Sequence, residues 1–227
     1  MKNKIIIIGV ICVLLVLVFI FGKSDDTKNK EEMLNINYNV KGNEVSLEKY
    51  ETDNPVVAMY IEKYGSVVME LYPDKAPNTV NNFISLIKSG FYDNNTFHRL
   101  VTGFVLQGGD PDGTGAGGPG YSIKGEFSDN GFENDLKHEK GILSMARSTD
   151  NDSAGSQFFI MLDKSEYLDG KYAAFGKVID GFDIIEKIEK NERVADSESG
   201  KLVKNLTLKK TLVDLKGKEY PEVEKIN

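Results

Sequence analysis

Short β-rich segments separated by turn-forming residues are the feature that most limits the folds open to this chain of 227 residues. β-branched and aromatic residues dominate these segments, and glycine or asparagine often follows them, which is typical of antiparallel strands. Helical periodicity is confined to residues 77–88 and 182–188. We predict strands at residues 56–62, 66–71, 142–146, 157–162, 173–178 and 205–215, and a strand, turn and strand over 96–107. Many strands with two helices predict a mainly β fold with a closed or sandwiched core, and not a parallel α/β sheet.

An uncharged apolar run occupies residues 5–22, and Lys2 and Lys4 precede it. At about 1.5 Å per residue, a helix of this length is roughly 27 Å long, close to the thickness of bilayer hydrocarbon. Basic residues before such a run favour an N-terminus in the cytoplasm. We therefore expect a single-pass membrane anchor with the rest of the chain outside the cytoplasm. Two alternatives stay open, a cleaved signal peptide and a lipoprotein signal ending at Cys12, and each would also export the chain.

Four parts follow from this pattern, beginning with an anchor or signal segment at residues 1–22. Residues 23–52 are rich in charged residues and asparagine without a sustained period, so we interpret them as a polar tether. Residues 53–215 form the folded domain, and residues 216–227 a charged, frayed tail. Cys12 is the only cysteine and lies in the apolar run, which excludes a disulfide within the chain and argues against a catalytic thiol.

Several classes of function are disfavoured. The net charge of −7 argues against a nucleic-acid partner, because phosphate binding needs a basic face. Gly113, Gly115 and Gly118 satisfy the spacing of a dinucleotide-binding loop, but no helical pattern follows them. His98 and His138, the only histidines, do not have the spacing of a metal site. A Ser-His-Asp triad is not excluded by residue count, although no nucleophile elbow is present.

A series of sequence blocks carries the positive signal. Phe-His-Arg-Leu at 97–100 is followed by Gly-Phe-Val-Leu-Gln-Gly-Gly-Asp at 103–110 and by Gly-Ile-Leu-Ser-Met-Ala at 141–146. Further blocks lie at residues 155–160, 167–172 and 175–178. In order and spacing, the series resembles the cyclophilin family over about residues 56–215. The resemblance implies a closed eight-stranded antiparallel β-barrel capped by two α-helices. It also implies a peptidyl-prolyl cis-trans isomerase that binds X-Pro peptides in a surface groove, without a cofactor, a metal or a covalent intermediate.

Arg99 matches the catalytic arginine of the family. The reaction rotates a tertiary amide against a barrier of about 18–20 kcal/mol. Twisting breaks the amide resonance and no proton has to leave, so a fixed cation that donates to the twisted amide suffices to stabilise the transition state. An arginine stays charged and has a rigid fork of donors, which suits this role.

The resemblance also implies a set of substrate-binding residues. The proline pocket is assigned to four apolar residues and the peptide-backbone contacts to two glutamines, with four further positions around the groove. These residues are Phe104, Val105, Phe159 and Leu168; Gln107 and Gln157; and Ala146, Arg147, Tyr167 and Tyr172. Four of them depart from the commonest pattern, since Val105 replaces Met, Arg147 replaces Asn, Tyr167 replaces Trp and Tyr172 replaces His. We expect weak binding of cyclosporin, because the family's Trp at position 167 helps to bind it.

Two hypotheses of function remain. We expect an active isomerase that assists the folding of exported proteins near the membrane. The alternative is a catalytically weak module or chaperone that binds proline-containing peptides in the same groove.

Overall fold

The computed structural model describes residues 37–226 except 41 and 42, with side chains from residue 45 onward. The predicted anchor at residues 1–22 and most of the tether therefore lie outside the described residues. Within the described part, no helix combines the length and apolar character that crossing a membrane would require. The first described elements are β1 (Asn37–Val40) and β2 (Asn43–Ser46), which pair as an antiparallel hairpin.

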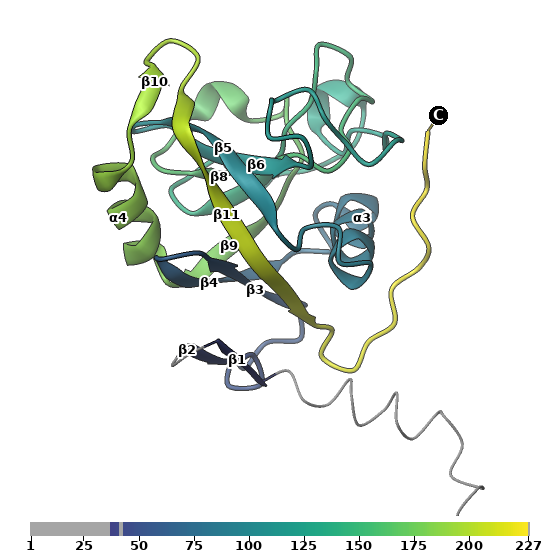
Figure 1. The fold of residues 1–227 in the computed structure, drawn as a ribbon. Coiled ribbons are helices and arrows are strands. Elements are labelled where there is room, and N and C mark those ends of the chain that lie inside the picture. Colours follow the sequence, from purple (N-terminus) through teal and green to yellow (C-terminus); the bar gives the residue numbers. More distant parts are fainter. Residues whose placement is uncertain (1–36, 41–42, 227) are drawn as a thin grey trace, which may run out of the picture.

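Eight antiparallel strands close into a barrel (Figure 1). Their order is β11-β3-β4-β9-β7-β8-β6-β5, and the pairing of β5 with β11 closes the ring. The strands are β3 (Val56–Ile61), β4 (Gly65–Leu71), β5 (Asn95–Val101), β6 (Val105–Asp110), β7 (Ile142–Met145), β8 (Phe158–Met161), β9 (Ala174–Asp180) and β11 (Lys201–Asp214). The predicted eight-stranded barrel is confirmed. A further short strand that was not predicted, β10 (Val194–Asp196), pairs with β11 outside the ring.

Two helices and two helical turns accompany the barrel. Helix α3 (Pro77–Lys88) has the predicted bounds, whereas α4 (Phe182–Asn191) is longer than predicted. Figure 1 shows the two helices on opposite sides of the barrel. The 3₁₀ turns are η1 (Ser128–Asn130) and η2 (Glu166–Leu168).

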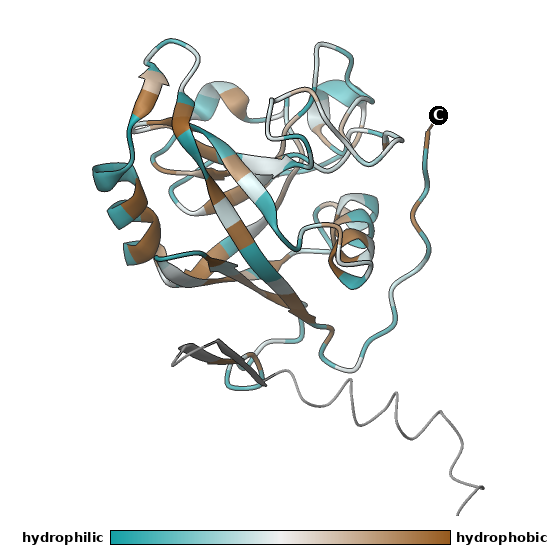
Figure 2. Ribbon diagram, viewed as in Figure 1, coloured by the Kyte–Doolittle hydropathy of each residue, from teal (hydrophilic) through white to brown (hydrophobic). Residues whose placement is uncertain are grey.

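Alternation along the strands separates two apolar clusters. On β8, Phe158 and Ile160 belong to the large cluster that fills the barrel and packs against both helices. Phe159 and Met161, which alternate with them along the strand, belong to a second cluster on the outer face. Successive strand residues point to opposite faces, so a continuously apolar strand supplies both. Along β11, whose outer face is more polar, apolar and hydrophilic residues alternate (Figure 2).

Helix α3 begins where a distant carboxylate can accept its first N–H groups. Glu126, which is buried, accepts hydrogen bonds from the backbone N–H of Asn78 (2.9 Å) and Thr79 (2.7 Å). Its negative charge also suits the positive end of the helix dipole. From the buried face of the helix, Phe83 contacts the ring of Phe158 edge-on at 5.3 Å, which fixes the helix against the barrel interior.

The predicted polar tether extends too far toward the C-terminus. Leu47 is fully buried on the outside of the barrel, where it joins a cluster with Val56, Ala58 and Val68. A single leucine in a polar stretch gives no periodic signal, so its burial could not be predicted from the sequence. The tether interpretation is therefore wrong for the residues around Leu47, which are part of the folded domain.

The C-terminal tail is docked and not frayed. Ile226 exchanges two backbone hydrogen bonds with Ser122, at 3.0 and 2.7 Å. The Asn78 side chain bonds the backbone of Glu224 through both its amide ends, each at 2.9 Å. Figure 1 shows this segment, in yellow, running past α3. Side-chain capping of an extended strand leaves no local sequence signature, which explains the error.

Candidate functional site

A row of directly paired residues crosses four neighbouring strands. Arg99 on β5 is opposite Gln107 on β6, Gln107 is opposite Phe159 on β8, and Phe159 is opposite Ser144 on β7. Directly opposed residues in antiparallel strands place their side chains on the same face. The barrel therefore brings together a cation, an amide and an aromatic ring that are far apart in the sequence.

Arg99 is half-buried and is held at two of its nitrogens. Its Nε donates to the carbonyl oxygen of Ser199 at 2.8 Å, and its Nη1 donates to Oε1 of Gln107 at 3.1 Å. Both acceptors are neutral, so neither cancels the charge of the guanidinium. Burial lowers the pKa of Arg99 from its ordinary value, but an arginine of this kind stays protonated. The guanidinium is thus a fixed cation with N–H groups to spare.

The two predicted glutamines form a chain that ends at Arg99. Nε2 of Gln107 donates to Oε1 of Gln157 at 3.0 Å. Nε2 of Gln157 donates in turn to the carbonyl oxygens of Gly115 (3.0 Å) and Gly117 (2.9 Å). Every link is a side-chain amide with a defined direction, so the chain fixes where donors and acceptors lie.

An apolar surface lies beside this chain, which we call the outer apolar cluster. Its buried members are Val105, Ile142, Phe159, Met161, Leu168 and Ala174, and Val101, Phe104, Leu136, Ala146 and Tyr172 pack against them partly exposed. Tyr167 stacks on Phe104 with ring centres 5.8 Å apart and is 61% exposed. All four residues assigned to the proline pocket belong to this cluster.

The side chain of Arg147 makes its contacts with the protein itself, which the sequence did not predict. Its guanidinium lies over the rings of Tyr172 (4.7 Å) and Phe127 (5.0 Å). Nε and Nη2 both donate to the carbonyl oxygen of Lys171, at 3.1 and 2.8 Å. Arg147 therefore braces the surface around Tyr172, with most of its donors used within the protein.

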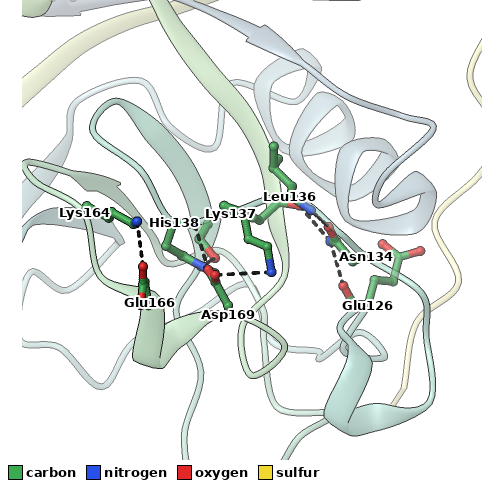
Figure 3. A network of polar contacts seen from close by, with 10 residues as sticks. Glu126, Asn134, Leu136, Lys137, His138, Lys164, Glu166 and Asp169 are labelled. Carbon is green, nitrogen blue, oxygen red and sulfur yellow. Dashed lines mark hydrogen bonds and ion pairs between the residues drawn. The ribbon is translucent and has the colours of Figure 1, made fainter.

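Ser144, His138 and Asp169 form a Ser-His-Asp arrangement, of which Figure 3 shows His138 and Asp169. Nδ1 of His138 is 3.1 Å from Oδ1 of Asp169, and its Nε2 is 3.0 Å from Oγ of Ser144. Ser144 is 0% exposed and His138 is 1% exposed, so the serine cannot reach a substrate. The His138 ring instead stacks on Phe159 at 6.1 Å, and Figure 3 shows Asp169 between His138 and Lys137. We interpret this network as support for the outer apolar cluster.

Burial sets the protonation of that network. It lowers the pKa of His138, although Asp169 opposes the shift. The neutral imidazole donates from Nδ1 to the carboxylate and accepts from the serine hydroxyl at Nε2. Both ring nitrogens of His138 and the hydroxyl of Ser144 then have hydrogen-bond partners.

Sequence reasoning missed two parts of the site. The Ser199 carbonyl is a backbone group, and no side-chain pattern could have indicated it. Asp110 stands in the block that ends Gly-Gly-Asp, yet its carboxylate contacts only backbone N–H groups and a neighbouring hydroxyl of the following loop. A carboxylate that organises a loop has the same sequence signature as one that is exposed.

Comparisons with known proteins identify the family of the chain. The family described as "Cyclophilin type peptidyl-prolyl cis-trans isomerase/CLD" matches residues 56–213. Peptidyl-prolyl cis-trans isomerase B of Bacillus subtilis is 46% identical over 132 residues, which are 58% of this chain and 89% of that protein. Peptidyl-prolyl cis-trans isomerase-like 2 of Cryptococcus neoformans is 45% identical over 128 residues, 56% of this chain but only 22% of that longer protein.

A solved structure has the same fold. It is the crystal structure of a cyclophilin type peptidyl-prolyl cis-trans isomerase from Cryptosporidium parvum in the presence of the dipeptide Ala-Pro. The match has a TM-score of 0.63 and 35% sequence identity, and it covers 70% of this chain and 98% of that one.

Proposed function

The chain belongs to the cyclophilin-type family of peptidyl-prolyl cis-trans isomerases, and from its geometry we propose that it rotates X-Pro bonds beneath the guanidinium of Arg99. The observation that carries this proposal is the fixation of Arg99 at Nε and Nη1 by two neutral acceptors. The cation is oriented before any substrate binds, and its other N–H groups remain available to the substrate.

The chemistry requires only differential binding. A planar X-Pro amide has a resonance-stabilised nitrogen that accepts poorly, whereas the twisted amide has a basic nitrogen and a ketone-like carbonyl. A donor fixed beside the twisted amide therefore stabilises the transition state more than either planar ground state. Orientation in advance matters because the donor then needs no reorganisation during the rotation.

The outer apolar cluster supplies the surface for the proline ring. Phe159 is paired with Gln107, which is in turn paired with Arg99, and Phe104, Val105 and Leu168 belong to the same apolar cluster. The Cryptosporidium relative solved with Ala-Pro supports a proline-containing ligand for this chain too. Burying a proline ring here places its nitrogen within reach of the arginine.

Gln107 and Gln157 are suited to hold the peptide backbone. Both amides use their oxygen and their NH₂ group within the chain of hydrogen bonds, but each oxygen can accept a second hydrogen bond and Gln107 keeps a second N–H. Their fixed directions would align the substrate backbone with Arg99. Ala146, Tyr167 and Tyr172 extend the contact surface on either side.

We also place this activity outside the cytoplasm, tethered to a membrane. The support is the apolar run at residues 5–22 with its two preceding lysines. The clients would then be newly exported polypeptides, in which X-Pro isomerisation is slow enough to limit folding.

A proline-isomerisation assay on residues 24–227 tests the catalytic proposal. We expect the fragment to accelerate cis-to-trans conversion of a short X-Pro peptide well above the uncatalysed rate. Binding of the same peptide without acceleration would instead favour the alternative of a binding module.

A further inference from the structure

Asp110 is a fully buried carboxylate at the end of β6. It accepts hydrogen bonds from the backbone N–H of Asp112 (2.8 Å), Thr114 (2.9 Å) and Gly115 (2.5 Å). Burial alone would raise the pKa of Asp110, but the backbone N–H donors outweigh it and lower the pKa. A buried charge needs such partners, so residues 111–117, which we call the glycine-rich loop, are folded around the carboxylate.

The glycine-rich loop presents two carbonyl groups to Gln157. The oxygens of Gly115 and Gly117 accept from Nε2 of Gln157 at 3.0 and 2.9 Å. Gly117 lies so close to the carboxylate that a Cβ there would collide with Oδ1 of Asp110. The positions of the two carbonyls thus depend on the packing of the loop around Asp110.

These carbonyls determine the direction of two amides. Because Nε2 of Gln157 faces the carbonyls, its Oε1 faces Gln107 and accepts from Nε2 of that residue. The Oε1 of Gln107 is consequently left for Nη1 of Arg99. If either amide turned over, an NH₂ group would meet the guanidinium or another NH₂ group, and two donors would oppose each other.

We propose that Asp110 is a positioning residue for the isomerisation, because its carboxylate fixes the direction of both glutamine amides and, through them, the orientation of Arg99. The proposal rests on the function proposed above for Arg99. It differs from a role in stability alone, since a purely structural carboxylate could be altered in a folded variant without any change at the two amides.

The sequence allows these amides to be observed directly. Gln107 and Gln157 are the only glutamines in the chain, so selective ¹⁵N labelling of glutamine side chains reports on them alone. The experiment uses the full-length protein in detergent and compares three variants. Asp110→Asn replaces an acceptor oxygen by NH₂, and Gly117→Ala drives a methyl group into the carboxylate. Gly118→Ala is the matched control, because a Cβ there meets nothing within 4 Å.

In the first two variants, we expect the Gln157 amide protons to exchange with water about tenfold faster, and kcat to fall about tenfold with KM within about twofold of wild type. The control should match wild type in both measurements. Gly117→Ala lies on a surface loop and decides the matter if Asp110→Asn does not fold.

The outcomes separate this proposal from the function on which it rests. Unchanged exchange in a folded Asp110→Asn or Gly117→Ala protein overturns the link from Asp110 to the amides. Faster exchange with unchanged kcat overturns its importance for catalysis. Neither result bears on the proposed role of Arg99, which is contradicted only if Arg99→Ala keeps wild-type turnover.

Discussion

Arg99 and Ser199 are one hundred residues apart in the sequence, yet Nε of Arg99 donates to the Ser199 carbonyl at 2.8 Å. The contact exists because β11 closes the barrel against β5, where Lys201 is paired with Arg99. The turn that precedes β11 is held in place by Asp196, whose carboxylate accepts the backbone N–H of Ser199 at 2.9 Å. The strand that closes the barrel therefore also brings the carbonyl that orients the guanidinium of Arg99.

Gly200→Ala tests this coupling. Gly200 has a φ of 71°, and a Cβ there would lie 2.5 Å from Cγ2 of Val101 and 2.7 Å from the Leu100 carbonyl oxygen. We expect the turn to shift, the Ser199 carbonyl to move and turnover to fall about tenfold. Gly217→Ala is the control, since its φ of 72° gives similar strain, about 1–2 kcal/mol, with nothing within 4 Å. Isomerase assays and urea denaturation of both variants would separate the effects, and equal turnover in the two would contradict the coupling.

Tyr167→Trp should tighten cyclosporin binding. Tyr167 is exposed and stacks on Phe104, so it offers ring surface but no indole N–H. The missing hydrogen bond and apolar area together amount to about 1–3 kcal/mol, or roughly five- to a hundredfold in affinity. Catalysis should change little, because Tyr167 does not bond Arg99 or the glutamines. A paired titration and isomerase assay checks this, and tight wild-type binding that tryptophan does not improve would contradict it.

Unfolding should become easier below about pH 6.5, the ordinary pKa of histidine. Burial lowers the pKa of both His98 and His138 in the folded protein. Below that pH, the unfolded chain binds more protons than the folded one. The free energy of unfolding therefore decreases as the pH is lowered, by up to about 1.4 kcal/mol per pH unit for each histidine. Urea denaturation at pH 7.5 and 5.5 measures the slope. His138→Gln should reduce the slope, whatever it does to stability at pH 7.5, and an unchanged slope would contradict the account.

The membrane topology can be tested in bacterial cells that express the full chain. Lys2 and Lys4 should hold the N-terminus inside, with residues 24–227 outside. Protease added to intact spheroplasts should then remove the catalytic domain, while a cytoplasmic marker protein stays intact. Degradation of the domain only after lysis would show that the chain is not exported in this way.

Local patterns predicted the elements better than the contacts between them. The period of Val80, Phe83 and Ile87 identified α3, because an amphipathic helix repeats its signal in every turn. The barrel and the position of Arg99 came from the resemblance to the cyclophilins, since strand pairing over a hundred residues has no local signature. Burial of Leu47 and the backbone contact of Ser199 had no sequence signal at all.

Turnover by Arg99→Ala tests the central claim most directly. Losing a preorganised donor from comparable sites costs about 2.7–4 kcal/mol, so kcat/KM for an X-Pro peptide should fall about a hundredfold or more. Arg99→Lys should recover only part of the activity, because an ammonium lacks the planar fork. Lys88→Ala removes an exposed cation at the end of α3 and should be as active as wild type. A folded Arg99→Ala protein, judged by circular dichroism, with turnover near that of wild type would contradict the account.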